Sequence, residues 1–177
     1  ADTNTAVGYE SLTDNTTGNN NTALGRKSLT ENTTGGNNTA VGTSAIFSNT
    51  TGSNNTAIGF AALDIITTAS GNTAVGSDAL GSNTTRSSNT AVGYRAGMDN
   101  TSGEITAVGA QALTDNTTGT GNTAVGYQAL YQNTTGSANT AVGNNFAGTI
   151  GGAMFANTTG SQNCAFGPGA LYSNTTA

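Results

Sequence analysis

Apolar residues recur along this chain at a fixed interval of 17 residues. An Ala, a larger apolar residue and a Gly occur in succession, and a Leu-type residue follows four positions after the Gly. The consensus unit is N-T-A-V-G-x-x-A-L-x-x-N-T-T-G-x-x. The glycines of the Ala-Val-Gly step are Gly8, Gly25, Gly42, Gly59, Gly76, Gly93, Gly109, Gly126, Gly143 and Gly167. A constant period predicts an array of stacked structural repeats.

The repeat units form one array over 1–177, without a second domain. They begin near residues 4, 21, 38, 55, 72, 89, 105, 122, 139 and 163. One unit, between Gly93 and Gly109, has 16 residues, and another, between Gly143 and Gly167, has 24. The longer unit contains an insertion at 144–152, which we expect to be a surface loop.

The unit is too short for a helix pair or a propeller blade, and Asn, Thr and Gly are poor helix formers. The pattern therefore predicts an all-β solenoid of about ten 17-residue coils. Each coil offers two short extended runs, 4–7 and 11–13 in the first unit, separated by Gly8 and by the Asn-Thr-Thr-Gly corner at 15–18. Glycine supplies the positive φ that tight corners need.

Side-chain alternation predicts how each coil is filled. Thr5 and Val7 should share one face of the extended run, and Asn4 and Ala6 the other. Coils stacked about 4.8 Å apart would superimpose equal columns and form Asn and Thr ladders along the axis. We expect Val7 and Leu12 to form the core. Because this core is small, we expect the Ala columns to line a second face that packs against identical chains in a homotrimer. A monomer held by stacking alone is the alternative.

Composition narrows the function. Thr, Asn and Gly make up close to half of the chain, charged residues are 7%, and His is absent. The chain has no His and one Cys, so it lacks the residues for the usual catalytic triads and zinc sites. We therefore expect no enzyme, no cofactor and no metal site. A net charge of −5 with four cations disfavours nucleic acid and anionic membranes as partners. No apolar run is long enough for membrane insertion.

Irregular positions are candidates for specific contacts. Aromatic residues concentrate just after the repeat Gly and just after the Leu, and rings on a polar rod suit sugars or proteins. The candidate surface contacts are Tyr9, Phe60, Tyr94, Tyr127, Tyr131, Asn144, Asn145, Phe146 and Ile150. In the alternative interpretation, the rings cover corners or fill subunit boundaries, and the loop is a tolerated bulge.

Other irregularities predict local packing rather than sites. Residues 66–69 replace Asn-Thr-Thr-Gly in unit four, and 103–105 shorten the same corner in unit six. Cys164 occupies the Thr column, where we expect it to be a small buried substitute. Acidic residues precede the corner Asn too sporadically for a calcium ladder; they are Asp14, Glu31, Asp99 and Asp115.

The Ala-Val-Gly step, preceded by Asn-Thr and followed two residues later by Ala/Ser-Leu, resembles the YadA-like head repeats of trimeric autotransporter adhesins. The full unit at 122–136 also resembles the repeat arrays of phage tail-fibre proteins. The resemblance covers 4–176 and implies a left-handed, trimeric β-roll in an extracellular or virion-borne fibre. The 17-residue unit is longer than the adhesin repeats, and no individual binding residue carries over from them.

These observations together predict a structural and adhesive fibre, a rod about 45–50 Å long, that contacts a cell-surface glycan or protein receptor. The chain begins and ends inside the repeat, so we expect a segment of a longer fibre. Polysaccharide cleavage would need clustered carboxylates, which the repeat does not provide.

Two alternatives stay open. An ice-binding solenoid could use the column that contains Thr5, Thr22, Thr39 and Thr56, although sharing a face with Val7 argues that this column is partly buried. A self-assembling extracellular filament could form because the repeat has no polar caps.

Overall fold

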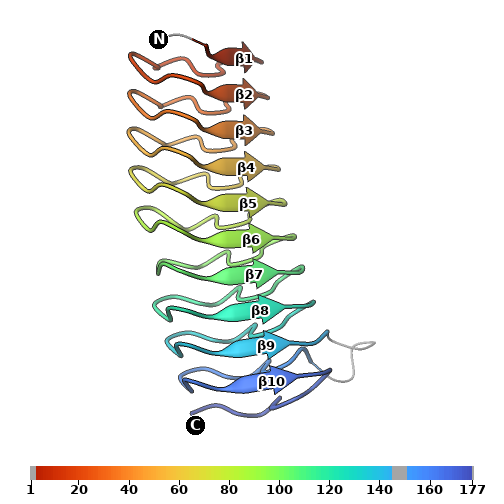
Figure 1. Cartoon of the computed structure of the whole chain (residues 1–177). Coiled ribbons are helices and arrows are strands. Elements are labelled where there is room, and N and C mark those ends of the chain that lie inside the picture. The colour runs from red at the N-terminus through yellow and green to blue at the C-terminus, as the bar shows by residue number, and fades with distance from the viewer. Residues whose placement is uncertain (1–2, 145–150, 177) are drawn as a thin grey trace.

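The computed structural model describes residues 3–144 and 151–176 and forms a parallel β-solenoid (Figure 1). Ten strands of three residues make one sheet in chain order, and no helix occurs in the described ranges. The strands are β1 (Thr5–Val7), β2 (Thr22–Leu24), β3 (Thr39–Val41), β4 (Thr56–Ile58), β5 (Thr73–Val75), β6 (Thr90–Val92), β7 (Thr106–Val108), β8 (Thr123–Val125), β9 (Thr140–Val142) and β10 (Cys164–Phe166). The predicted all-β solenoid is confirmed.

Strand register follows the repeat. Thr5 pairs with Thr22 and Ala6 with Ala23, and equal positions pair in the same way up to Thr140 with Cys164. The ten strands close nine complete coils, slightly fewer than the ten expected, because β10 has no following strand among the described residues. Seven of these coils have 17 residues, β6 to β7 takes 16, and β9 to β10 takes 24.

The buried and the exposed face of each strand are the reverse of our expectation. From Ala23 to Ala165 the Ala column is buried, with Ala23 and Ala141 at 0% exposure, and it forms one core cluster with the buried Leu column. The Val column points outward, and Val7 is 57% exposed. The prediction that Val7 and Leu12 share the core while Ala faces another chain is therefore wrong. The coil is thin, and the Leu side chain leaves room opposite it only for a methyl group.

The second predicted extended run, 11–13, is also wrong, because these residues form turns. Glu10 and Leu12 both have φ of 54°, in the left-handed region, and the equivalent residues of later coils repeat this pattern. Left-handed conformations cost about 1–2 kcal/mol per non-glycine residue. Hydrogen bonds between coils offset this cost: the Leu12 amide donates to the Ser28 carbonyl at 3.0 Å.

The glycine after each strand is required by the close approach of the next coil. Gly8 has φ of 140°, and a Cβ built on it would collide with the carbonyl of Gly25. A side chain here would be strained twice, by the backbone conformation and by the neighbouring coil.

Two Asn ladders run along the stack, as predicted, and the structure places them inside the solenoid. In one, the backbone amide of Asn21 donates to Asn4 Oδ1 at 2.8 Å. In the other, Asn32 Nδ2 donates to Asn15 Oδ1 at 2.8 Å. Both Asn21 and Asn32 also donate to the carbonyl of Gly35, so the two ladders meet at the Asn-Thr-Thr-Gly corner. Hydrogen bonding satisfies these buried amides and makes a polar interior possible.

The Thr ladder forms outside this polar interior. Thr16 Oγ1 donates to the Thr33 carbonyl at 2.8 Å, and Thr33 Oγ1 to the Thr50 carbonyl at 2.8 Å. The hydroxyls therefore bond to backbone carbonyls of the next coil, rather than to one another.

Candidate interaction surfaces

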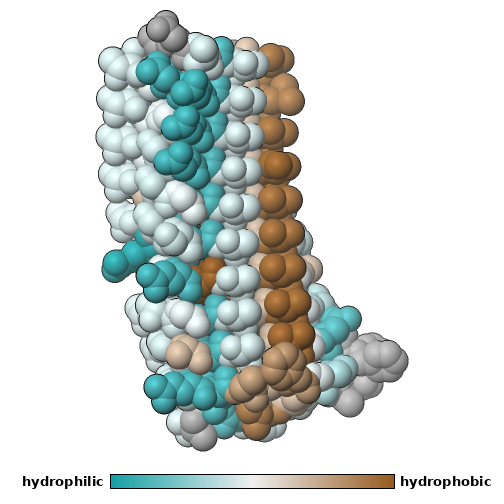
Figure 2. Space-filling model, viewed as in Figure 1, coloured by the Kyte–Doolittle hydropathy of each residue, from teal (hydrophilic) through white to brown (hydrophobic). Residues whose placement is uncertain are grey.

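The outer face of the sheet carries an apolar stripe along the whole stack (Figure 2). The stripe is the Val column, which consists of Val7, Leu24, Val41, Ile58, Val75, Val92, Val108, Val125, Val142 and Phe166. Six of its members are exposed, and the other four are half-buried. Neither this column nor the Thr column beside it contains a charged residue. A continuous apolar patch on a chain with so few large apolar side chains is a candidate interaction surface.

The Thr column lies on the same face as the Val column, as predicted. Thr5 and Thr22 are exposed, whereas the column is half-buried from Thr39 to Thr140. The partial burial comes from neighbours in the stack, since this face has no second layer. Cys164 occupies the Thr column but is exposed, so the expected buried substitute is a wrong prediction.

The aromatic residues that follow the repeat glycine are exposed, but the structure keeps them apart. Tyr9, Phe60, Tyr94 and Tyr127 stand on different coils, with at least one intervening coil between any two. Arg95 lies 5.1 Å from the ring centre of Tyr94. Each of these rings is available for contacts, but the four do not form a continuous aromatic surface.

The aromatic residues of the other column stack on one another. Tyr131 and Phe155 have ring centres 5.2 Å apart, and Phe155 and Tyr172 5.5 Å apart. Tyr131 is half-buried in this stack, so the corner-covering interpretation describes it better than a free contact residue. Among the loop candidates, Asn144 is exposed. Asn145, Phe146 and Ile150 lie outside the described residues.

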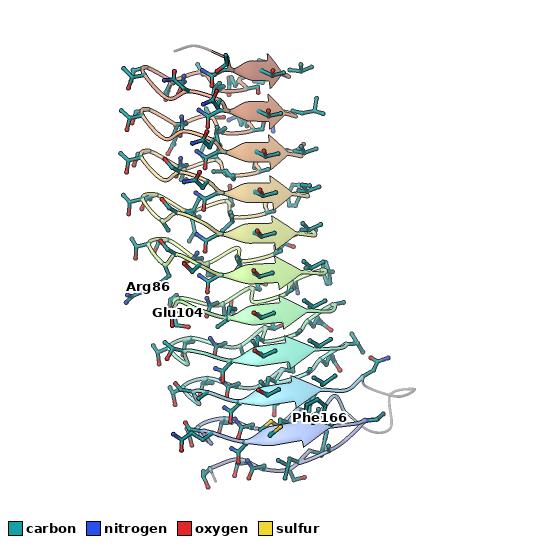
Figure 3. The ribbon with its side chains drawn as sticks, in the orientation of Figure 1. Arg86, Glu104 and Phe166 are labelled. Atoms are coloured by element: carbon teal, nitrogen blue, oxygen red, sulfur yellow. The ribbon has the colours of Figure 1, made fainter. Side chains whose placement is uncertain are left out.

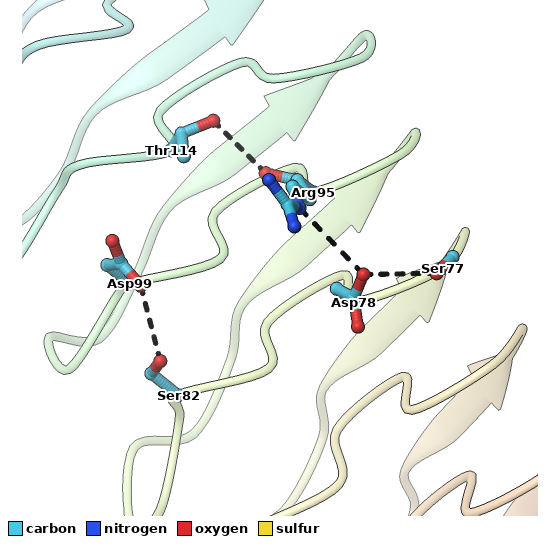
Figure 4. Close-up of polar contacts among 6 residues, drawn as sticks. All are labelled: Ser77, Asp78, Ser82, Arg95, Asp99 and Thr114. Atoms are coloured by element: carbon cyan, nitrogen blue, oxygen red, sulfur yellow. Dashed lines mark hydrogen bonds and ion pairs between the residues drawn. The ribbon is translucent and has the colours of Figure 1, made fainter.

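Charged side chains form contacts between neighbouring coils (Figure 4). Arg95 Nε lies 3.9 Å from Asp78 Oδ2, an ion pair without a hydrogen bond, and Ser77 Oγ donates to the same carboxylate at 3.1 Å. Ser82 Oγ donates to Asp99 Oδ1 at 3.4 Å. In the first two coils, Lys27 Nζ lies 3.4 Å from Glu10 Oε2.

The surroundings of three carboxyl groups, on Glu10, Asp64 and Asp115, shift their pKa values. Burial, followed by the nearby charges of Asp78 and Glu31, raises the pKa of Asp64. A hydrogen bond with Tyr9 lowers the pKa of the Glu10 carboxyl, and the same bond raises the pKa of the Tyr9 hydroxyl. Within 3–144 and 151–176, His, Cys, Asp and Glu form no group of three that could hold a metal ion.

A hollow interrupts the Asn-Thr-Thr-Gly edge at the 16-residue coil. It has a volume of about 410 Å³ and is lined by Thr85, Arg86, Ser87, Ser88, Gly103, Glu104 and Thr120. Arg86 and Glu104 project from the same edge of the solenoid (Figure 3). Sequence reasoning noted the short unit but missed that Arg86 occupies the corner-glycine position of the adjacent unit. When the 16-residue unit is aligned with the unit before it, Arg86 and the missing residue fall at the same corner.

The fold and these surfaces define a parallel β-solenoid repeat protein with one apolar outer stripe. In the described part of the chain, no helix is long and apolar enough to cross a membrane. Comparison with protein-family models, curated proteins and solved structures found no match to this chain.

Proposed function

We propose that this chain is a structural and adhesive segment of an extracellular fibre, borne by a virion or a cell. In this role it extends outward and presents variable side chains to a surface glycan or protein. The uninterrupted stack of coils carries the proposal. Equal positions of the repeat pair from β1 to β10, and internal Asn ladders reinforce the backbone hydrogen bonds. Such a stack is a rigid spacer with many equivalent outer positions.

We further propose that three chains pack their Val columns around a common axis, in the left-handed β-roll that the adhesin resemblance implies. The stripe is apolar, free of charge and as long as the sheet. Burying each such side chain contributes about 1.5–3 kcal/mol, and a straight stack repeats this contribution on every coil. Side-chain size varies from Val to Leu24 and Phe166, which suits apolar packing better than a uniform planar lattice.

The solution mass, measured by light scattering after size exclusion, tests the assembly. We expect a mass of three chains, and a shift to one chain when Val75→Lys and Val92→Lys place two charges in the middle of the stripe. Thr51→Lys is the control, because it adds a charge at an exposed corner position away from the stripe. A monomeric parent chain would overturn the trimer, and a large, polydisperse mass would indicate end-to-end filaments.

Adhesion needs a separate measurement on the assembled chain. We expect the fluorescently labelled protein to bind whole cells in a saturable manner, with competition by unlabelled protein. Absence of binding across bacterial and eukaryotic cell panels would leave a spacer role and overturn the adhesive one.

Ice binding is the second candidate, and one observation favours it. The Thr and Val columns point outward from a regular sheet, so hydroxyl and methyl groups repeat about every 4.8 Å along the stack and about 7 Å across it. Thermal hysteresis measured on the monomeric fraction tests this candidate. Because a trimer would cover the same face, ice binding requires the monomer, and a monomeric fraction without hysteresis would exclude it.

A further inference from the structure

The hollow arises from two coupled departures from the repeat. In regular coils the corner position is Gly, and a Cβ at Gly18 would collide with the carbonyl of Gly35 in the next coil. Arg86 stands at this position in the coil that precedes the 16-residue unit. A side chain fits there because the next coil is retracted at the same corner.

Hydrogen bonds locate the missing residue in the short coil. Asn116 Nδ2 donates to the carbonyl of Gly119, three residues later, as in the regular units. Asn100 Nδ2 donates instead to the carbonyl of Ser102, two residues later, at 2.7 Å. Ser102 therefore takes the place of the corner glycine, and the absent residue is the second Thr of the corner. The loss of this outermost residue opens the hollow.

The side chains around the hollow are polar and held by their coils. Arg86 Nε donates to the Thr101 carbonyl at 3.2 Å, which holds the guanidinium against the retracted coil. Glu104 is exposed on that coil with φ of 64°. A second, smaller hollow of about 150 Å³ adjoins the first, and Thr101, Ser102 and Thr118 contribute to its lining. Hydroxyl groups and backbone supply the rest of both surfaces.

Arg86 differs from the other cations of the chain. Lys27 and Arg95 each have a carboxylate within 4.0 Å, and Arg26 lies over the ring of Tyr9. In the part of the chain that the structure describes, Arg86 has neither an ion-pair partner nor a ring. One cation and one carboxylate thus line the same hollow without pairing.

We propose that this hollow binds a neutral carbohydrate unit. A sugar hydroxyl can donate to the Glu104 carboxylate, accept from the Arg86 guanidinium and exchange hydrogen bonds with the Thr hydroxyls. Glu104 disfavours an anionic ligand and Arg86 a cationic one, whereas the polar lining gives an apolar ligand little to contact. The volume falls within the range of small-molecule sites. The inference rests on the proposed adhesive function and names the ligand class.

Saturation-transfer NMR with methyl glycosides of glucose, galactose and N-acetylglucosamine tests the proposal on the whole chain. Each glycoside is used at about 10 mM, enough to populate a site of millimolar Kd. We expect saturation transfer to at least one glycoside. Arg86→Gln or Glu104→Gln should weaken its binding about tenfold, because each removes charge-assisted hydrogen bonds. Arg26→Gln and Glu31→Gln make the same chemical changes on other coils and should leave binding unchanged.

A rebuilt variant separates the hollow from its individual charges. Inserting a Thr between Thr101 and Ser102, together with Arg86→Gly, restores the 17-residue unit and the corner glycine. We expect this variant to keep its melting temperature and lose glycoside binding. No transfer to any glycoside, equal transfer in all variants, or Arg86-dependent binding of acetate alone would each overturn the proposal. Cell adhesion that persists in the rebuilt variant would overturn the hollow as the adhesive contact and leave the fibre function standing.

Discussion

Ile105 fills the core space that Gly97 leaves empty. Gly97 occupies the Leu column, and a Cβ built on it would lie 3.0 Å from Ile105 Cδ1. Ile105 in turn occupies a position that is Asn in the regular units, and it is 1% exposed. At this coil, therefore, Gly97 replaces the usual Leu and Ile105 replaces the usual Asn, and the Ile105 side chain compensates for the missing Leu side chain.

This exchange predicts non-additive mutations. Gly97→Leu alone should destabilise the protein by about 1–3 kcal/mol through overpacking against Ile105. Adding Ile105→Asn should recover much of this loss, because it restores the regular Leu and Asn columns. The left-handed φ of 58° at Gly97 is no obstacle, since Leu80 and Leu113 have φ of 51° and 52° in that column. Urea unfolding of the single and double variants measures the coupling, and additive effects would contradict it.

A second departure from the repeat, Ile66 in place of Asn, breaks one Asn ladder. Asn49 donates to Asn32 Oδ1 at 2.7 Å, but Asn49 Oδ1 is buried and has no hydrogen-bond donor. Ile66 stands where the next Asn of the ladder would donate. In the Ile66→Asn background, Asn49→Ala should cost about 1 kcal/mol more than in the parent chain, because a hydrogen bond has been added. A double-mutant cycle with a coupling near zero would refute this account.

The repeat glycines allow a matched test of backbone constraint. Gly76→Ala should destabilise the chain strongly or prevent folding, because φ is 135° and the new Cβ collides with the carbonyl of Gly93. Gly71→Ala is the control: its Cβ meets nothing within 4 Å, and Ala138 has φ of 56° in the same column. We expect this control to change stability by less than about 1 kcal/mol. Circular dichroism and thermal unfolding compare the two variants, and similar melting temperatures would contradict the prediction.

Burial of Asp64 predicts a pH-dependent gain from its neutral replacement. Because its pKa is raised in the folded chain, ionised Asp64 opposes folding, and this penalty is fully present above the folded pKa. The penalty disappears as pH falls below the unfolded value of about 3.9. Asp64→Asn should therefore raise the melting temperature at pH 7 and have no such effect near pH 3. A gain of equal size at both pH values would point to packing instead of charge.

Only part of the candidate interaction surface could be anticipated from the repeat, because the apolar stripe was expected in the core. Tyr9 and Tyr127, which share one column, are exposed as expected, because they follow a corner and lie outside the strand. The half-burial of Tyr131 could not be read from its own unit, since ring stacking depends on aromatic residues one and two coils away. The hollow could not be anticipated because Arg86 and Glu104 belong to different units and line one hollow only when the coils stack.

The 17-residue period by itself determined a parallel stack, its register and its ladders, because equal residues must superimpose when identical coils pair in parallel. It also located each irregular coil. Only the tertiary structure decided which face of the strand is inside. Alternation places Ala6 and Val7 on opposite faces of the strand but does not decide which side chain fits inside the coil. That depends on the volume that the Leu column leaves across a thin coil. That volume places the methyl column inside and the Val column outside, where it forms the apolar stripe.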